Sequence, residues 1–232
     1  MNVAIIAAAG QGTRIGGATA KQFLELSGVP VIIHTLRRFE ECAAINEIIV
    51  TLPAPDVAGF LALAGKYNLR KISRVVPGGA TRAESVARGL QAMRETAIGI
   101  IAVHDGVRPF VTPDEISRTI EAAQASGAAI LATPATDTIK EVESDVVQRT
   151  LDRARLRHAL TPQCFDYNLL RRAYEQLNEL NVAEITDDSF LVERLGVAVS
   201  VVEGSARNIK ITRPEDLAFA EILLKQMSDV GC

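Results

Sequence analysis

Short apolar runs alternate with amphipathic stretches along the first 135 residues of the chain. Apolar runs of strand length lie at residues 2–8, 46–52, 72–76, 98–104 and 128–133. Apolar side chains recur at helical spacing in the segments 31–40, 57–67, 82–95 and 113–126. Because a strand buried on both faces is apolar at every position, this order predicts an α/β fold in which helices flank a mostly parallel sheet.

One of these helices carries clear signals at both ends. Thr112 and Pro113 supply a capping residue and a proline for the first helical position, and Asp114 and Glu115 place two acids in the first turn. Gly127 follows the last position of the apolar pattern. These residues predict a helix over 113–126.

Residues 134–155 interrupt the alternation and predict a projecting arm. Two short polar strands, Asp137–Glu143 and Val146–Leu151, are joined at Glu143-Ser144-Asp145, which is the pattern of a β-hairpin. Such an arm has too few apolar residues for a core of its own. In an enzyme its packing is usually completed by a second copy of the chain, so we expect a homodimer formed through the arm.

The rest of the chain predicts more alternating elements. Helices fit residues near 166–179 and 187–195, strands fit 197–202 and 208–211, and a last helix runs from Pro214 to about Met227. There is no internal repeat or linker, so we expect one domain over 1–232. No apolar run is long enough to span a membrane.

Composition and charge exclude several classes of protein. The chain is 48% hydrophobic and only 4% aromatic, with no Trp, so its core is aliphatic. A net charge of −3 and the lack of a basic block argue against binding to a nucleic acid polymer. Three cysteines without CxxC spacing form neither a disulfide framework nor a zinc site. We expect a reducing, cytoplasmic setting.

The loop after the first strand is the first candidate ligand site. Gly10 and Gly12 have the spacing that turns several N–H groups toward one anion, and Arg14 and Lys21 add two cations. The Walker pattern fails because no GK[ST] follows, and the dinucleotide pattern fails because Ile15 occupies its third glycine position. The glycines alone fit a ligand-free turn equally well, but the two cations favour a triphosphate.

Several sequence motifs of this chain resemble those of a known family of enzymes. The runs AAAGQGTR and KQFLELSGVPVIIHTL resemble the opening of the nucleotidyltransferases that activate sugar and polyol phosphates, and among them the 2-C-methyl-D-erythritol 4-phosphate cytidylyltransferase family. More of the family's motifs follow in the same order: Gly78-Gly79 with Arg82 and Ser85, Val103–Pro109, Asp137–Lys140, Asp152-Arg153, Leu160–Gln163, Thr186-Asp187-Asp188 and Asn208–Leu217. Several separated motifs in one order are more specific than any one of them.

The resemblance implies a Rossmann-like fold with a dimerisation arm, and a reaction. CMP would pass from CTP to 2-C-methyl-D-erythritol 4-phosphate by direct in-line attack, with pyrophosphate leaving, to give 4-diphosphocytidyl-2-C-methyl-D-erythritol for isoprenoid biosynthesis. Arg14 and Lys21 correspond to the family's transition-state cations. The implied cofactor is Mg²⁺ or another divalent cation, held mainly by the CTP phosphates and close to Asp105.

The same resemblance assigns the two substrates. The implied nucleotide-binding residues are Ala8, Ala9, Gly10, Gly12, Gly78, Gly79, Arg82, Ser85 and Asp105. Arg153 and Lys210 would position the polyol phosphate, with Arg153 reaching into the partner subunit's site. Further candidate substrate contacts are Arg108, Thr138, Thr161 and Thr186. His104 is expected to be structural.

Some alternatives stay open. Asp105 alone fits a turn cap as well as a ligand contact, and Gly78-Gly79 alone fits an ordinary turn. The family often has an acidic residue where this chain has Ala80, and Pro where it has Ala20, which leaves residues 15–20 more conformational freedom. A cytidylyltransferase for ribitol 5-phosphate or another polyol phosphate is the nearest rival, and a nucleotide-binding module without catalysis is the second.

Overall fold

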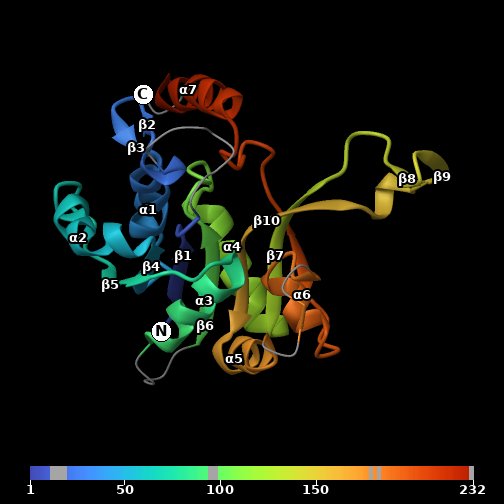
Figure 1. Ribbon diagram of the computed structural model, residues 1–232, viewed down its shortest axis with the longest axis horizontal. Coiled ribbons are helices and arrows are strands. Elements are labelled where there is room, and N and C mark those ends of the chain that lie inside the picture. The colour runs from blue at the N-terminus through green and yellow to red at the C-terminus, as the bar shows by residue number, and fades with distance from the viewer. Residues whose placement is uncertain (11–19, 94–98, 178–179, 182–183, 230–232) are drawn as a thin grey trace.

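The computed structural model describes residues 1–10, 20–93, 99–177, 180–181 and 184–229. Its main feature is a seven-stranded sheet in the order β11-β7-β10-β6-β1-β4-β5 (Figure 1). The strands are β1 Val3–Ala7, β4 Glu47–Leu52, β5 Ile72–Pro77, β6 Ile100–Asp105, β7 Ala128–Pro134, β10 Arg157–Asp166 and β11 Ser200–Glu203. All neighbours are parallel except that β10 runs antiparallel to both β6 and β7. The predicted mostly parallel α/β sheet is confirmed.

Helices cover both faces of this sheet. One face carries α1 Val31–Glu41, α2 Val57–Gly65 and α4 Pro113–Ser126, and the other carries α3 Arg82–Gln91, α5 Tyr167–Glu175 and α6 Asp188–Glu193. The side chains of β1 alternate between the two layers, because Ala4 and Ile6 join one core cluster and Val3 and Ile5 the other. Burial on both faces explains why this strand is apolar throughout.

The ends of α4 are those that its sequence signals predict. Thr112 accepts a hydrogen bond from the Glu115 N–H, and the Glu115 carboxylate accepts one from the Thr112 N–H, which completes a capping box. Gly127 ends the helix with φ +85°, in the left-handed region that glycine tolerates best.

Strand register brings the loops of the candidate site together. Ala7 lies opposite Asp105 on β6 and opposite Thr51 on β4, and Leu52 lies opposite Pro77 on β5. The last residues of four parallel strands therefore form one row across the sheet. The loops that follow them open on the same edge, where α/β sheets bind ligands.

Strand β10 is the main element that the sequence pattern fails to predict. Pro162 lies within the strand, and polar residues such as Thr161 and Gln163 break its apolar pattern. The register with β7 shifts between Ala159 and Gln163, which accommodates the proline. The expected strand at 208–211 is wrong, because this segment has an irregular backbone: the Asn208 and Ile209 N–H groups bond locally, to Ser205 and Arg207, and the Ile211 N–H bonds to the Val107 carbonyl.

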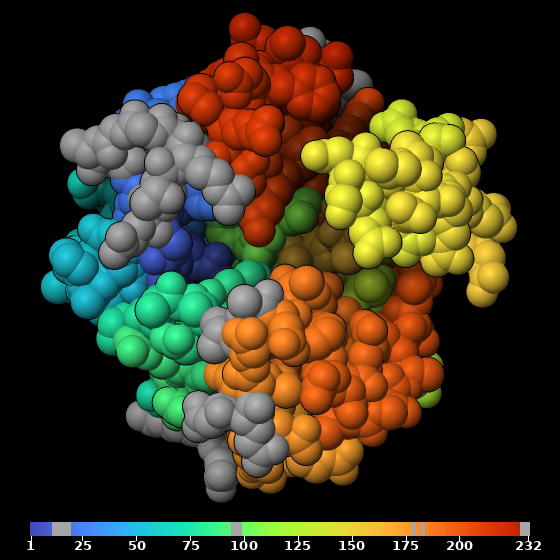
Figure 2. All heavy atoms as spheres, turned by 45° about the vertical axis from the view of Figure 1, so that its right-hand side comes forward, coloured from blue at the N-terminus to red at the C-terminus, as the bar shows by residue number. Residues whose placement is uncertain are grey.

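The predicted hairpin is present as an arm that projects from the body of the molecule (Figures 1 and 2). Its strands are β8 Lys140–Glu143 and β9 Val146–Thr150, and every residue in them is exposed. Ser144 and Asp145 turn the chain with φ of 49° and 64°. Val142, Val146 and Val147 are 55–61% exposed, so this chain leaves an apolar strip of the arm uncovered.

The remaining elements lie beyond the sheet edge that carries the site. A small hairpin of β2 Glu25–Leu26 and β3 Val29–Pro30 packs with α7 Pro214–Asp229 in a third apolar cluster. Single 3-10 turns are η1 Lys21–Phe23, η2 Ala54–Asp56 and η3 Arg153–Arg155. Among the described residues, no helix is long and apolar enough to cross a membrane.

A pair of helical glycines tests how tightly α3 packs on the sheet. A Cβ at Gly89 would lie 2.8 Å from Ile5 Cγ2, whereas a Cβ at Gly59 in α2 would meet nothing within 4 Å. We expect Gly89→Ala to lower the free energy of unfolding by about 1–3 kcal/mol through overpacking. The control Gly59→Ala should raise it by about 0.4–1 kcal/mol, because alanine restricts the unfolded chain.

Urea unfolding of the two variants beside the parent chain measures both effects. Equal stabilisation by the two substitutions would contradict the close contact between α3 and β1.

Candidate active site

A cavity of about 500 Å³ lies where the carboxyl ends of β1 and β6 meet the loop between β5 and α3. Figure 2 shows this face hollowed at its centre, between the red C-terminal segment and the green residues around α3. The cavity is lined by Ala7, Ala8, Ala9, Gly10, Lys21, Gln22, Gly79, Ala80, Thr81, Arg82, Ser85, Asp105, Val107 and Lys210. Most of the predicted nucleotide-binding residues are therefore together, while Gly12 and Arg14 lie outside the described residues.

Two glycines allow the loops around the cavity to touch. A Cβ at Gly78 would lie 2.1 Å from Ala9 Cβ, and a Cβ at Gly106 would lie 2.6 Å from Ala8 Cβ. Both distances are far below van der Waals contact, so only glycine lets these backbones approach the loop after β1. Gly78 is not among the residues that line the cavity, and its close approach to Ala9 gives it a packing role beside the nucleotide contact predicted for it.

Polar groups at the start of α3 and in the loop before it form hydrogen bonds with one another. Thr81 caps the helix by accepting from the Glu84 N–H at 3.1 Å. The Ser85 hydroxyl donates to the Thr81 carbonyl at 2.8 Å and accepts from the Gly79 N–H at 3.1 Å. The Ala80 N–H donates to the Glu84 carboxylate at 2.8 Å. Thus the Ala80 N–H is engaged within the loop, and the Ser85 hydroxyl holds the loop in shape.

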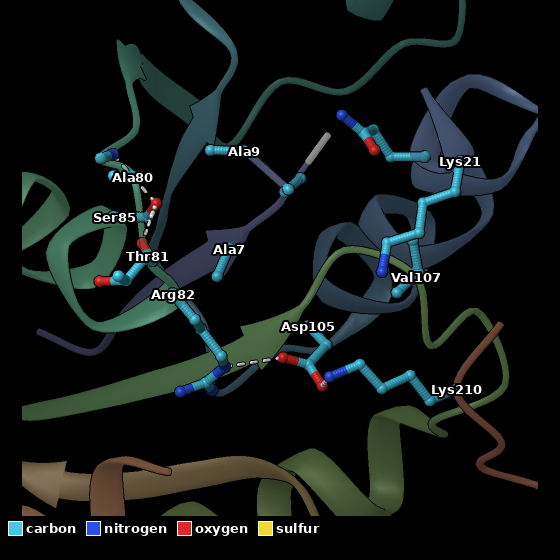
Figure 3. A pocket seen from close by; sticks show the side chains of 14 residues that line it. Ala7, Ala9, Lys21, Ala80, Thr81, Arg82, Ser85, Asp105, Val107 and Lys210 are labelled. Carbon is cyan, nitrogen blue, oxygen red and sulfur yellow. Dashed lines mark hydrogen bonds and ion pairs between the residues drawn. The ribbon is translucent and has the colours of Figure 1, made fainter. Parts of the chain in front are cut away.

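Asp105 lies on the floor of the cavity beside Arg82 and Lys210 (Figure 3), and Arg108 is a third cation bound to it. Its Oδ1 is 2.9 Å from Arg82 Nε, and its Oδ2 is 2.9 Å from Lys210 Nζ and 3.3 Å from Arg108 Nε. Burial opposes ionisation, but Arg82, Lys210 and Arg108 outweigh it and hold the pKa of Asp105 well below its usual range. The carboxylate is therefore ionised and serves as the centre of a charge cluster.

Arg82 joins this cluster to a second buried carboxylate. Its guanidinium is 2.8 Å from Asp188, which is fully buried and also accepts from the Tyr174 hydroxyl at 2.5 Å. Burial alone would lower the pKa of Arg82, but Asp188 and Asp105 raise it well above the usual value. Sequence reasoning did not assign Asp188 or Tyr174, although Asp188 belongs to the Thr186-Asp187-Asp188 motif.

His104 and Thr161 hold the end of β6 in place through hydrogen bonds. His104 Nε2 donates to the Arg108 carbonyl at 3.1 Å, because a carbonyl only accepts, and its Nδ1 therefore accepts from the Thr161 hydroxyl at 3.0 Å. The same hydroxyl accepts from the Asp105 N–H at 3.2 Å. Thr161 is buried, so its hydroxyl positions Asp105 rather than contacting a polyol as predicted. The expected structural role of His104 agrees with this geometry.

Several predicted substrate contacts are not among the residues that line the cavity of their own chain. Thr138 and Thr186 are exposed on loops, and Arg153 is exposed near the base of the arm, where it donates to the Thr136 carbonyl at 2.8 Å. Arg108 is largely buried and donates to the Asn208 carbonyl at 2.8 Å as well as to Asp105. None of these four residues lines the cavity.

The cavity does not form a metal cage from the residues that the structure describes. Asp105 is the only acidic side chain among the lining residues named above, and both of its oxygens contact cations. Within the same described ranges, no group of three or more His, Cys, Asp or Glu side chains is arranged to hold a metal ion. A divalent cation here would depend on ligands that a bound nucleotide supplies.

Comparison with known sequences shows which family this chain resembles. The family model of IspD, 2-C-methyl-D-erythritol 4-phosphate cytidylyltransferase, matches residues 2–226. The cytidylyltransferase of that name from Syntrophus aciditrophicus is 46% identical over 226 residues, which cover 97% of this chain and 96% of the relative. Its counterpart from Bacillus cytotoxicus is 45% identical, over 97% of this chain and 98% of its own.

Solved structures with similar folds match this chain over nearly its whole length. The crystal structure of 4-diphosphocytidyl-2C-methyl-D-erythritol synthase from Anaerococcus prevotii has a TM-score of 0.85 at 34% identity, and covers 97% of this chain and 96% of its own. The 2-C-methyl-D-erythritol 4-phosphate cytidylyltransferase from Thermus thermophilus gives 0.75 at 35% identity, with coverage of 96% and 98%.

The buried His104 predicts an acid-sensitive fold. Burial lowers the pKa of His104 from 6.5 to about 3, so the folded protein keeps it neutral while the unfolded chain takes up a proton below pH 6.5. Its contribution to stability is complete above pH 6.5 and is lost as the pH falls toward 3. Between pH 7 and pH 5 this loss amounts to about 2 kcal/mol.

We expect His104→Gln to show a shallower fall in the free energy of unfolding from pH 7 to pH 5 than the parent chain, even if it is less stable at pH 7. His158→Gln, at an exposed position of β10, is the control and should keep the parent slope. Chemical denaturation at both pH values measures the slopes, and identical slopes for all three proteins would refute the assignment.

Proposed function

The chain belongs to the 2-C-methyl-D-erythritol 4-phosphate cytidylyltransferase family, and we propose that the cavity beside β1 and β6 binds CTP. The protein is a cytidylyltransferase that transfers CMP to 2-C-methyl-D-erythritol 4-phosphate in the non-mevalonate route to isoprenoids. The observation that carries the proposed site is the convergence of Lys21, Arg82 and Lys210 on one small-residue cavity.

The chemistry requires positive charge at this place. A phosphate oxygen of the acceptor attacks the α-phosphorus of CTP, a new P–O bond forms, and the bond to the bridging oxygen breaks as pyrophosphate leaves. Both reactants are anions, so the barrier is largely electrostatic. The cluster of Arg82, Arg108, Lys210, Asp105 and Asp188 has one positive charge in excess, and Lys21 adds a second. A positive cavity in an acidic chain favours this reaction.

We propose that the nucleotide lies across the cavity with its phosphates beside Lys21. In Figure 3, Lys21 and Lys210 point into one space from one side, while Ala80, Thr81 and Ser85 form the opposite wall. Small side chains at Ala8, Ala9 and Gly10 leave room for the triphosphate and ribose. The base then faces Gly79, Ala80 and Ser85, where carbonyl oxygens can accept from the cytosine amine. The resemblance pairs Lys21 with Arg14 as the transition-state cations.

We propose that the acceptor site is completed by a second subunit. Lys210 lines the cavity, but Arg153 of the same chain lies outside it, at the base of the arm. The exposed strip of Val142, Val146 and Val147 supports a homodimer through the arm, because such a strip is stabilised by burial against another chain. Arg153 of one subunit would then orient the acceptor phosphate in the partner's site, with Thr138 and Thr186 as further candidate contacts.

We propose that a divalent cation enters with the CTP phosphates, since the described lining residues offer no metal cage, and no step above depends on it. We also propose a reducing, cytoplasmic setting, which the free thiols of Cys42 and Cys164 support. Burial raises the pKa of the Cys164 thiol, which makes it unreactive.

The two rival functions are separable in one assay. Neither a ribitol 5-phosphate acceptor nor a module without catalysis is favoured by the family match. Pyrophosphate release should require CTP and should be faster with methylerythritol phosphate than with ribitol 5-phosphate. Faster release with ribitol 5-phosphate, or CTP binding with no release for either acceptor, would contradict the assignment.

The role of Lys21 predicts a selective loss of turnover. Lys21→Ala should lower kcat by about 10²–10³-fold with a smaller change in KM for CTP, because a transition-state cation acts mainly on the reacting state. Lys66→Ala, exposed at the end of α2, is the control and should keep the parent rate. A change confined to KM would refute the transition-state role.

Subunit sharing predicts recovery of activity in mixed dimers. Arg153→Ala and Lys21→Ala chains should each be nearly inactive, but their hybrid dimer has one site with both residues intact. After complete exchange at equal concentrations, activity should reach about a quarter of the parent value, since half of the dimers are hybrids with one intact site each. No recovery after mass spectrometry has confirmed exchange would contradict sharing.

A further inference from the structure

Gln22 is a buried polar residue of the cavity wall that the proposed function does not use. It lies in the η1 turn directly after Lys21, and its side chain is 1% exposed. Among the residues that the structure describes, neither its amide nitrogen nor its amide oxygen has a hydrogen-bond partner, yet the residue lines the cavity. A buried amide without a partner is unfavourable, and such groups in native proteins usually have a function.

The turn around Gln22 is held firmly in place. The Phe23 N–H donates to the Ala20 carbonyl at 2.8 Å, and the Leu24 N–H donates to the Lys21 carbonyl at 3.3 Å. The Phe23 ring packs against Phe60, with centroids 6.3 Å apart. Because the flanking residues are fixed by these contacts, the Gln22 side chain stays at the wall of the cavity.

Gln163 is a second buried glutamine, and its hydrogen bonds are those of a residue with a structural role. It is also 1% exposed, but its Nε2 donates to Asp187 at 2.8 Å. Its Oε1 accepts from the N–H groups of Asp188 and Ser189 at 3.0 and 3.1 Å. The structural glutamine thus has a partner on each of its polar atoms, whereas the equally buried Gln22 has none within the described part of the chain.

We propose that Gln22 is a positioning residue for CTP, with its amide Nε2 donating to a non-bridging oxygen of the β- or γ-phosphate. Gln22 follows Lys21 in the chain, and the Lys21 Cε lies 4.0 Å from the Cβ position of Gly10, so this wall is the phosphate side of the cavity. The base side, formed by Ala80 and Ser85, belongs to α3 and its preceding loop. A neutral donor beside a cation adds direction to the contact without adding charge.

This inference rests on the proposed CTP site, and substitutions that keep the volume of the side chain test it. Gln22→Leu removes both polar atoms and leaves no partner unsatisfied. Its melting temperature without ligand should therefore equal or exceed that of the parent chain. Gln163→Leu is the matched control, and its melting temperature should fall because three hydrogen bonds are lost and Asp187, Asp188 and Ser189 lose a partner.

Isothermal titration separates the phosphate end from the nucleoside end. With CTP as the probe, Gln22→Leu should raise the Kd about tenfold, and Gln22→Glu should raise it further because a carboxylate repels the phosphates. With CMP, which lacks the β- and γ-phosphates, Gln22→Leu should bind nearly as the parent chain does. The KM for the acceptor should be unchanged.

Three outcomes would overturn the inference: an unchanged Kd for CTP in Gln22→Leu, an equal loss of affinity for CTP and CMP, or a fall in melting temperature like that of Gln163→Leu. The last two would show a structural role. If the parent chain itself does not bind CTP, the proposed function fails instead, so the two failures are distinguishable.

Discussion

The ionised Asp105 carboxylate at the end of β6 is the constraint on which the rest of the site depends. A buried carboxylate without partners would cost several kcal/mol, so the fold has to bring cations to it. They come from three separate segments: Arg82 from α3, Arg108 from the loop after β6, and Lys210 from the irregular segment before α7. Meeting this requirement places Arg82 and Lys210 at the wall of the cavity, so under the proposed function the same ion pairs serve both stability and substrate binding.

Backbone geometry makes the cluster possible. Parallel strands align Ala7 with Asp105, and Gly78 and Gly106 let the adjoining loops lie in contact with Ala8 and Ala9. A larger residue at either glycine would separate the loops. The cavity therefore owes its shape to the absence of side chains in a few places, and its charge to a few long side chains that reach in from the surrounding elements.

The polar residues around the cavity fall into two kinds. Thr161, His104 and Ser85 have their hydrogen-bonding groups engaged within the protein, and they hold the strand end and the α3 loop in position. Lys210 is 36% exposed, so it can change partner when a phosphate arrives, while its present contact with Asp105 keeps it in place. This division separates residues that shape the cavity from a residue that the proposed function assigns to binding, and it could not be made from residue type alone.

Features of this protein that depend on neighbouring residues could be predicted before the fold was known. The apolar runs, the capping box at Thr112, the polar hairpin at 134–155 and the order of the motifs predicted a mostly parallel α/β sheet, an arm and the cations at Lys21 and Lys210. Strand periodicity, caps and turns are local, so adjacent residues encode them. Which distant residues come into contact became known only from the folded chain. The proline at position 162 made the β10 segment look unlike a strand in the sequence. Only the pairing of that strand in the sheet brings Thr161 to His104 and Asp105. Likewise, the pairing of Arg82 with Asp188 and the unpaired amide of Gln22 depend on packing between segments far apart in the chain, because burial and charge compensation are properties of the assembled fold.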